Sequence, residues 1–348
     1  MRVCSAVSEL LYYAMHAQRG SPWVLGVAIV LAWTCTAHAG ALRRARLAPM
    51  WRPQAQFAGY YVADAKGIYV SNGIAATILA GGPDRPPLDM LTNGAADFAI
   101  LWLAAALQER AGGLPLVNLA QLLQRSGLML IAKKASGITR LDDLNGKKIG
   151  VWAGIHELQP RTLLAAHNLT ATLVPQSYSV NLFLRDAVQA TVAMWYNEYH
   201  TILSAGYDPG ELTTFMFSEY GLNFPEDGIY TLADTATRDP ALCRDFVQAS
   251  LAGWQYAFAH EEEALDIVLD RMEAAQTPAN RAQQRWMLRT LKALMNRDAD
   301  GGIAGELSAA SYHDVAALLQ RNGMVRRVPA FAAFHQPAPA ACAPRSAP

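Results

Sequence analysis

Residues 51–63 read WRPQAQFAGYYVA, and the expected fold is organised around this stretch. The apolar run 47–51 that leads into it is short enough to be a first strand. The spacing of Phe57 and Tyr60 predicts a helix, and Gly67 is its stop signal. A strand that leads through a polar and aromatic loop into a helix is how an α/β protein builds one wall of a ligand pocket.

The aromatic and amide side chains of this stretch are candidate ligand contacts. Amides both donate and accept hydrogen bonds, and aromatic rings pack against flat ligands. For the aromatic residues the alternative is ordinary core packing, which is the commoner environment of such side chains. The candidates from this stretch are Trp51, Gln54, Gln56 and Tyr60.

Strands and helices alternate through most of the chain, which predicts parallel sheets covered on both faces. A second α/β unit opens near residue 141, and the sequence is helical at amphipathic period after residue 240. Strands are expected near 75–79, 97–101, 116–122, 128–132, 148–152, 172–175, 191–195, 215–217 and 229–232, and helices near 88–93, 103–110, 158–167, 180–187, 197–204, 241–259, 261–274, 278–295 and 308–322.

The N-terminus has the pattern of a secretory signal peptide. The run 23–33, WVLGVAIVLAW, is too short to span a membrane, and Ala37 and Ala39 are the small residues that a signal peptidase reads. We expect residues 1–39 to be removed and the mature protein to be periplasmic, with initiation at Met1 or Met15. A lipoprotein anchored through Cys35 and an uncleaved anchor are the alternatives.

Composition excludes several classes of protein. The formal net charge is zero, so no basic field is available to hold nucleic acid. Cleavage would leave Cys243 and Cys342, which form neither a disulfide framework nor a metal site. We expect no metal and no cofactor. The Ala- and Pro-rich residues 335–348 are expected to be a disordered tail.

Five segments carry a family resemblance: WRPQAQFAGYYVADAKGIY, LTNGAADFAI, GITRLDDLNGKKIGV, MWYNEYH and YGLNFPEDGIY. Together they resemble the periplasmic substrate-binding proteins of ABC importers, in the branch shared by sulfonate-binding proteins and the thiamine-pyrimidine family. The resemblance covers about residues 45–325. The third segment is common to the whole superfamily, whereas the last two indicate the pyrimidine-precursor side.

This resemblance implies a type II periplasmic-binding fold, in which two α/β lobes are joined by two crossover strands and enclose a ligand cleft. We place lobe one at 45–130 and 231–330, and lobe two at 131–230. The implied partners are a small planar heterocycle, an ABC permease and its ATPase, and the protein is expected to be a monomer.

Two motifs of lobe two are candidate ligand sites. Gly154, Ile155 and His156 follow an expected strand, where free backbone amides suit an anion; a plain turn is the alternative. Trp195, Asn197 and Glu198 stand where another strand ends, at the edge that faces the crevice in a parallel sheet. Glu198 could accept a hydrogen bond from a ring amine, and Trp195 could stack on the ring. The alternative is that Glu198 is an acidic residue of the first helical turn, where the helix dipole favours a negative charge.

Three further residues complete the candidate set. Tyr220 and Asn223 lie in a loop before the return crossover, where they could line the cleft or tie the hinge. Trp102 follows the strand expected at 97–101 and could be a second stacking surface or part of the core.

The resemblance also raises an enzymatic alternative, the related thiamine pyrimidine synthase, which converts pyridoxal phosphate and its own histidine into the pyrimidine. That chemistry needs a lysine, a donor histidine and a cysteine cluster. The segment 100–105 holds no lysine or histidine, and 218–230 holds no cysteine. We therefore expect a binding protein with no catalytic residue. A binder of sulfonate- or nitrate-type anions is a third reading, for which Arg52 and Arg161 are the nearby cations.

Overall fold

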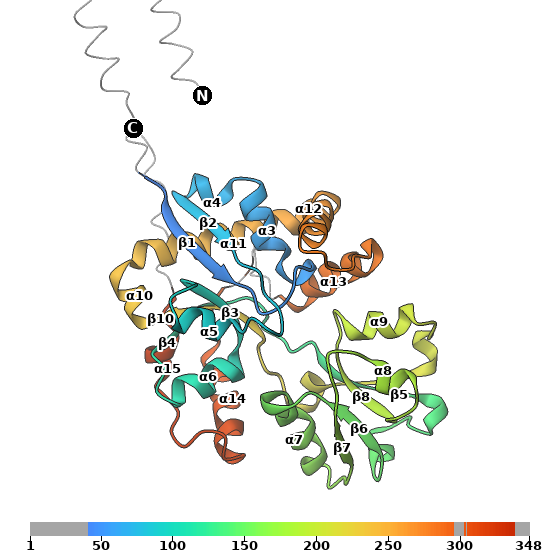
Figure 1. Ribbon diagram of the computed structural model, residues 1–348. Helices are drawn as coiled ribbons and strands as arrows, with labels where there is room; N and C mark the ends of the chain where they lie inside the picture. Colours follow the sequence, from blue (N-terminus) through green and yellow to red (C-terminus); the bar gives the residue numbers. More distant parts are fainter. Residues whose placement is uncertain (1–40, 296–302, 304, 338–348) are drawn as a thin grey trace, which may run out of the picture. The chain divides into compact units, whose positions relative to one another are not determined.

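The computed structural model describes residues 41–295, 303 and 305–337, and two mixed sheets organise this part of the chain (Figure 1). We call the first sheet with its helices lobe one and the second lobe two. The strands of lobe one lie in the order β2 (Ile74–Ile78), β1 (Arg43–Ala48), β3 (Phe98–Trp102), β10 (Asp227–Leu232) and β4 (Leu116–Gln121).

Lobe two repeats this arrangement. Its sheet has the order β7 (Thr172–Pro175), β6 (Lys148–Val151), β8 (Ala190–Met194), β5 (Leu128–Lys133) and β9 (Leu212–Met216). The strand expected at 215–217 is thus the end of a longer one, β9.

The sequence predicted parallel sheets, and the structure corrects this prediction. β1 pairs in parallel with β2 and β3, and β6 with β7 and β8. However, β10 runs antiparallel to β3 and β4, and β5 runs antiparallel to β8 and β9. The reason is the connectivity: β5 and β10 are the strands through which the chain enters lobe two and returns, so each enters its sheet from the crossover side.

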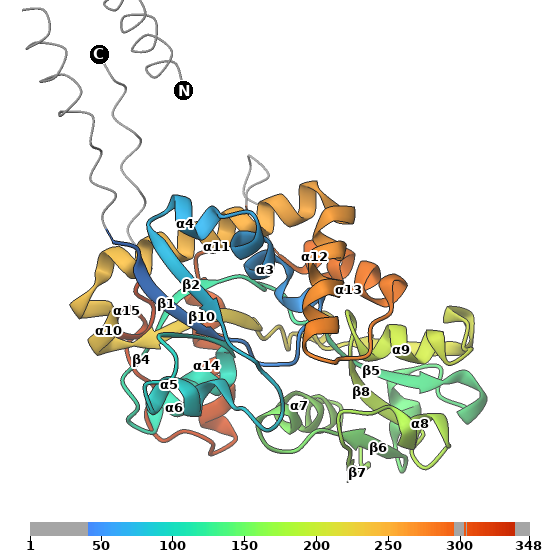
Figure 2. The ribbon, with the colours of Figure 1, turned by 45° about the horizontal axis from the view of Figure 1, so that its top comes forward.

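Helices cover both faces of the lobe-one sheet (Figures 1 and 2). One face packs against α3, α4 and α11, and the other against α5 and α6, with α14 on α6. The bounds are α3 (Ala58–Ala65), α4 (Ile68–Ser71), α5 (Pro87–Thr92), α6 (Leu103–Ala111), α10 (Ala233–Arg238), α11 (Pro240–Ala259), α12 (Glu261–Ala274), α13 (Arg281–Leu294), α14 (Ala309–Arg321) and α15 (Phe331–Phe334). In lobe two, the helices are α7 (Leu158–Ala166), α8 (Asn181–Leu184) and α9 (Glu198–Ser204).

Two glycines let α3 approach α11 closely. A Cβ built on Gly253 would collide with the carbonyl oxygen of Gly59, and one on Gly59 would collide with the ring of Trp254. Glycine therefore permits the backbone-to-backbone contact that fixes α3. The segment 51–57, just ahead of α3, is positioned by this contact.

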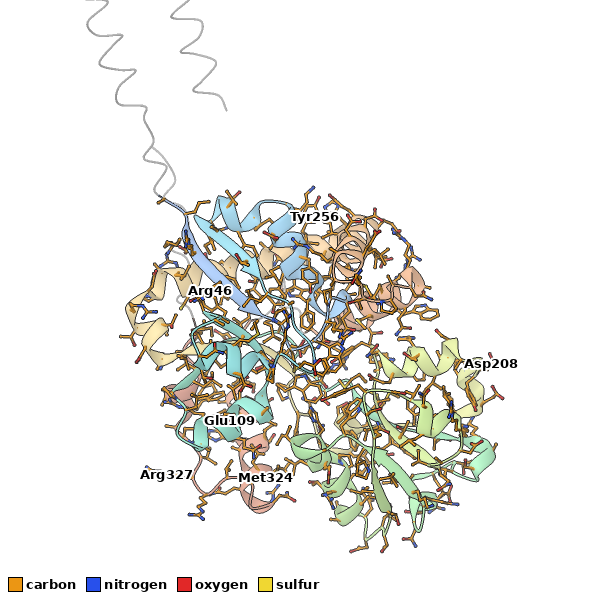
Figure 3. The ribbon with its side chains drawn as sticks, in the orientation of Figure 1. Arg46, Glu109, Asp208, Tyr256, Met324 and Arg327 are labelled. Atoms are coloured by element: carbon orange, nitrogen blue, oxygen red, sulfur yellow. The ribbon has the colours of Figure 1, made fainter. Side chains whose placement is uncertain are left out.

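Most charged side chains lie on the outside, as Glu109, Asp208 and Arg327 do (Figure 3). Within the residues that the structure describes, no helix is long and apolar enough to cross a membrane. The predicted signal peptide lies outside the described residues. The predicted tail begins inside them: His335 is buried and its Nδ1 lies 2.8 Å from Asn118 Oδ1, so at least this residue packs on lobe one.

Candidate functional site

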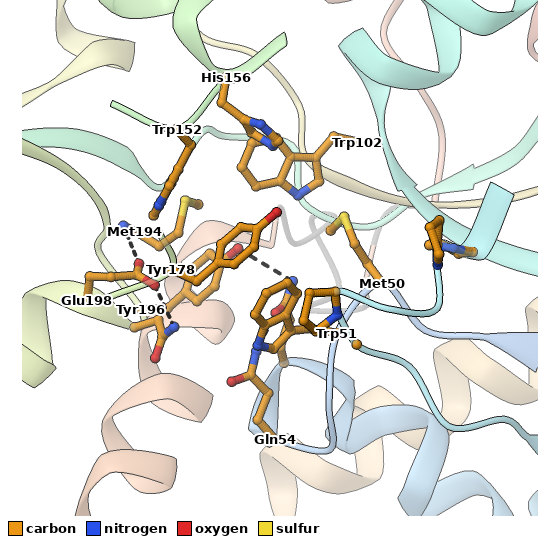
Figure 4. Close-up of a pocket in the computed structure, with 16 residues that line it drawn as sticks. Met50, Trp51, Gln54, Trp102, Trp152, His156, Tyr178, Met194, Tyr196 and Glu198 are labelled. Atoms are coloured by element: carbon orange, nitrogen blue, oxygen red, sulfur yellow. Dashed lines mark hydrogen bonds between the residues drawn. The ribbon is translucent and has the colours of Figure 1, made fainter. Parts of the chain in front are cut away.

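A cavity of about 280 Å³ opens where strands from both sheets end (Figure 4). Its side chains follow the carboxyl ends of β1, β3, β6, β7 and β8, the edge at which open α/β sheets bind ligands. The lining residues are Met50, Trp51, Gln54, Gln56, Gly82, Pro83, Pro86, Pro87, Trp102, Trp152, His156, Tyr178, Met194, Tyr196, Asn197 and Glu198.

Aromatic rings from the two lobes meet around this cavity (Figure 4). Trp51 of lobe one lies edge-on to Tyr178 of lobe two, with ring centroids 4.4 Å apart. Trp102 of lobe one contacts His156 of lobe two in the same way, at 4.8 Å. Burial lowers the pKa of His156, so its ring is neutral at pH 7 and behaves as another flat, weakly polar surface.

Glu198 is a buried carboxylate held in a fixed position at the start of α9. Its Oε2 accepts from the backbone N–H of Met194 at 2.9 Å, and its Oε1 accepts from Asn197 Nδ2 at 2.8 Å. Burial raises the pKa of Glu198, although these hydrogen bonds oppose the shift. A carboxylate has more acceptor sites than these two donors occupy, so Glu198 can also accept from a donor in the cavity.

Trp195, which was predicted to stack on the ligand, lies outside this cavity. Met194 and Tyr196 line the cavity instead. Successive side chains at a strand end point to opposite sides, so Trp195 is directed away from its two neighbours. It lines a second hollow together with Met129 and Tyr199.

An acidic residue lies behind the cavity wall at the start of β10. Asp227 is only 5% exposed, and its Oδ1 accepts from Trp102 Nε1 at 3.1 Å. Its Oδ2 accepts from Gln56 Nε2 at 2.9 Å, and Gln56 Oε1 accepts in turn from Gln54 Nε2 at 2.7 Å. Burial raises the pKa of Asp227 to about 7, while the bonds from Gln56 and Trp102 lower it.

The two crossover segments are tied to each other beside Asp227. Asn223 Oδ1 accepts from the N–H of Ser126 at 2.8 Å, and Glu226 Oε1 accepts from the N–H of Gly127 at 2.6 Å. Burial, and then the neighbouring Asp227, raise the pKa of Glu226 to about 8. Of the two roles considered for Asn223, lining the cleft or tying the hinge, the structure shows the tie.

The structure brings about half of the predicted site residues together. Those that line the cavity are Trp51, Gln54, Gln56, Trp102, His156, Asn197 and Glu198. Those that lie elsewhere are Tyr60, Gly154, Ile155, Trp195, Tyr220 and Asn223.

The residues outside the cavity have clear environments. Tyr60 is a core residue, 1% exposed and edge-on to Trp254, because α3 is buried on nearly every side. Tyr220 packs edge-on to His167. Gly154 has a positive φ of 74° and is exposed beside the cavity, while Ile155 packs against the core.

Sequence reasoning missed several lining residues, chiefly Trp152, Tyr178, Met194 and Tyr196. Each lies at or just after the end of a strand that was expected at nearly its observed position, so the rule that ligands bind at carboxyl ends of strands could have indicated them. The position of Asp227 in a polar loop before the return crossover marked it as a residue that could line the cleft or tie the hinge, but not as a partner of Gln56 and Trp102, which lie 171 and 125 positions away in the chain.

The cavity lining includes one carboxylate, Glu198, and no lysine, arginine or cysteine. Arg52 is exposed, and Arg161 pairs with Glu157 on α7. Among the described residues, no group of three potential metal ligands is assembled. The cavity is therefore suited to a flat molecule with hydrogen-bond donors rather than to an anion.

Comparisons with known proteins place this geometry in context. Residues 54–264 match the family model described as NMT1/THI5 like. The riboflavin-binding protein RibY of Chloroflexus aurantiacus is 27% identical over 250 residues, 68% of this chain and 68% of the relative. The 4-amino-5-hydroxymethyl-2-methylpyrimidine phosphate synthase of Legionella pneumophila is 24% identical over 254 residues, 69% of this chain and 77% of the relative.

Solved structures show the fold. The periplasmic aliphatic sulphonate binding protein SsuA from Escherichia coli superposes with a TM-score of 0.63 at 14% identity, over 85% of this chain and 92% of that one. The two mixed sheets are thus those of the type II periplasmic-binding fold, as the sequence predicted.

Proposed function

The chain belongs to the NMT1/THI5-like family, and from this premise we propose that it is an exported solute-binding protein that captures a small planar heterocycle for an ABC importer. A thiamine pyrimidine precursor, such as an aminomethyl- or hydroxymethyl-pyrimidine, is the first choice of ligand. The observation that carries the proposal is a cavity at the strand ends, enclosed by rings from both lobes and furnished with the fixed carboxylate of Glu198.

The chemistry of the cavity favours a flat ring with N–H donors. Trp51, Trp102 and Tyr178 offer ring faces and edges that gain dispersion and quadrupole contacts with another ring. Glu198 accepts hydrogen bonds, and an exocyclic amine or a protonated ring nitrogen would supply them. At about 280 Å³ the cavity lies at the small end of ligand pockets, which supports a single ring over a fused system.

The other parts of the proposal follow from the family. The protein would be secreted through the signal peptide at 1–39, bind its ligand as a monomer and deliver it unchanged to a permease and its ATPase. Lobe one at 45–130 and 231–330 would close on lobe two at 131–230 by bending at the crossovers, where Asn223 and Glu226 tie the two segments. The loop at Gly154 and Ile155 could then contact the ligand.

The rival functions make different demands on the cavity. A sulfonate or nitrate needs cationic or amide donors around its oxygens, whereas the charged residue that lines this cavity is an acid. A synthase that uses pyridoxal phosphate needs a lysine for its Schiff base, and none lines the cavity. Because the Legionella pneumophila relative is named a synthase, the experiment below also tests the enzymatic alternative.

Thermal-shift measurements on the purified protein test the proposal. We expect 4-amino-5-hydroxymethyl-2-methylpyrimidine to raise the midpoint of unfolding, because a ligand that binds only the folded state stabilises it by mass action. Riboflavin and an alkanesulfonate serve as the competing probes. A shift with the sulfonate alone would overturn the heterocycle proposal, and formation of the pyrimidine by protein incubated with pyridoxal phosphate would establish the synthase.

A further inference from the structure

We infer that Asp227, behind the cavity wall, determines which hydrogen-bonding group Gln54 presents to the ligand. Its carboxylate orients the amide of Gln56, and that amide orients the amide of Gln54. The inference rests on the proposed function and deepens it, because it assigns a specificity-determining residue that does not itself line the cavity.

The first step is the carboxylate of Asp227. The indole Nε1–H of Trp102 can only donate, so the atom that it faces, Asp227 Oδ1, has to accept. The second oxygen, Oδ2, lies 2.9 Å from Gln56 Nε2. Above the pKa of about 7 that burial gives Asp227, its carboxylate has no proton to donate, so Gln56 must turn its NH₂ group toward Asp227.

The second step is the pair of amides. With its NH₂ group on Asp227, and with Tyr196 Oη 3.5 Å from the same nitrogen, Gln56 directs its carbonyl oxygen to Gln54. Gln54 Nε2 donates to that oxygen at 2.7 Å. Gln56 is 5% exposed, so water cannot readily replace either bond.

The third step is the group that Gln54, the last residue of this hydrogen-bonded series, leaves without a partner. Gln54 lines the cavity, and among the described residues its side-chain hydrogen bond is made by Nε2, with none accepted by its carbonyl oxygen Oε1. This oxygen is therefore the free acceptor at the lobe-one wall, as Glu198 is an acceptor at the lobe-two wall. Together they select ligands that donate N–H or O–H groups from both edges.

Replacing Asp227 by asparagine should reverse the direction of the hydrogen bonds from residue 227 through Gln56 to Gln54. In Asp227→Asn the indole of Trp102 still requires an acceptor, so the new amide places its oxygen there and its NH₂ group toward Gln56. Gln56 must then offer its carbonyl oxygen to that group and its own NH₂ group to Gln54. As a result Gln54 would accept from Gln56 and turn its NH₂ group toward the cavity.

Two readouts test this reversal, in buffer well above the pKa of about 7 that burial gives Asp227. The first is the side-chain amide signal of Gln54 in protein labelled with ¹⁵N-glutamine, which reports its partner whether or not a ligand binds. The second is the ratio of affinities for 4-amino-5-hydroxymethyl-2-methylpyrimidine and its 4-oxo analogue, in which the exocyclic N–H donor is replaced by an acceptor and the adjacent ring nitrogen carries a hydrogen.

The matched control is Asp97→Asn, the same exchange at the opposite end of β3. Asp97 pairs with Arg46 and makes no contact with the amide chain. We expect Asp227→Asn to move the Gln54 signal and to change the affinity ratio about tenfold toward the oxo probe. Asp97→Asn should leave both as in the wild type.

The outcomes separate this inference from the proposed function. An unmoved Gln54 signal and an unchanged ratio in Asp227→Asn would overturn the inference while the wild type still binds the pyrimidine. Failure of the wild type to bind either probe would overturn the proposed pyrimidine, and the Gln54 signal alone would then decide the inference. If Asp227→Asn does not fold, Gln56→Leu replaces it, because leucine removes the hydrogen bonds that link Asp227 to Gln54. The Gln54 signal should then shift toward that of a solvated amide. An unshifted signal would overturn the inference.

Discussion

Among the residues that the structure describes, the cavity and a second hollow share the end of β8, and they differ in chemistry more than in size. The second hollow is the larger, about 370 Å³ against about 280 Å³. Its lining residues are Arg125, Ser126, Met129, Trp195, Tyr199, Thr214, Met216, Ser218, Glu219 and Leu294. Its two charged side chains, Arg125 and Glu219, are exposed to solvent, whereas Glu198 and Asp227 at the cavity are buried.

The difference teaches that volume does not identify the binding site. A buried, hydrogen-bonded carboxylate cannot rearrange or be satisfied by bulk water, so it discriminates among ligands. An exposed carboxylate is already solvated and gains little from a new partner. The cavity, with several rings and fixed polar groups, is the site that we propose, and the second hollow provides matched controls for it.

The largest expected effect concerns the buried carboxyls at the crossover. Burial raises the pKa of Glu226 from 4.5 to about 8 and that of Asp227 from 3.8 to about 7. The folded protein therefore retains these protons at pH values where the unfolded chain has lost them. This stabilisation is fully present below about pH 4 and is lost as pH rises through about 8, which lowers the free energy of unfolding by several kcal/mol.

Urea unfolding between about pH 5 and pH 9 measures this dependence. Other groups titrate in the same range, including His156, whose lowered pKa acts in the opposite direction. The informative quantity is therefore the difference between the wild type and Glu226→Gln, which should have a flatter profile. Glu219→Gln, at the exposed acid of the second hollow, should follow the wild type. Identical profiles for Glu226→Gln and the wild type would contradict the prediction.

A smaller effect is expected on ligand affinity when Glu198 in the cavity is replaced by glutamine. Glu198→Gln removes the charge from the acceptor in the cavity, and a hydrogen bond to a charged group is worth about 1.5–3 kcal/mol. We expect pyrimidine affinity, measured by calorimetry, to fall about 10- to 100-fold. Glu219→Gln is the control and should bind like the wild type. Equal losses in both variants would indicate a general effect of charge rather than a contact at Glu198.

The smallest expected effect compares the two tryptophans. Trp51→Ala removes a ring that contacts Tyr178 across the cavity, and such ring pairs contribute about 0.5–1.5 kcal/mol beyond their buried area. We expect affinity to fall about tenfold. Trp195→Ala empties part of the second hollow and should leave affinity unchanged. A loss confined to Trp195→Ala would move the binding site to the second hollow.

Much of the fold could be predicted from the sequence. The helix expected at 261–274 and the strand expected at 172–175 have the observed bounds, and most other elements differ by one or two residues. Hydrophobic period and turn residues are local signals, so they can be read without knowledge of tertiary contacts. The direction of β5 and β10 could not be predicted in this way, because antiparallel pairing depends on how the chain crosses between lobes.

The candidate site could be predicted less completely. Glu198, Trp51 and Trp102 were predicted because each stands at or just after the end of an expected strand, and all three line the cavity. Tyr60 packs in the core, and the sequence could not show this because an aromatic residue on a helix looks the same whether it faces a cavity or another helix. Trp195 was chosen over Tyr196 because a one-residue error at a strand end exchanges the two sides.

By itself, therefore, the sequence determined the order of strands and helices, the family and the sheet edge beside which the cavity lies, since these depend on neighbouring residues. Tertiary structure decided which side chains line the cavity and what holds them. Asp227 reaches Gln56 across 171 positions of chain, and Trp51 meets Tyr178 from another lobe. Such contacts exist only after distant segments pack, so no local pattern of residues encodes them.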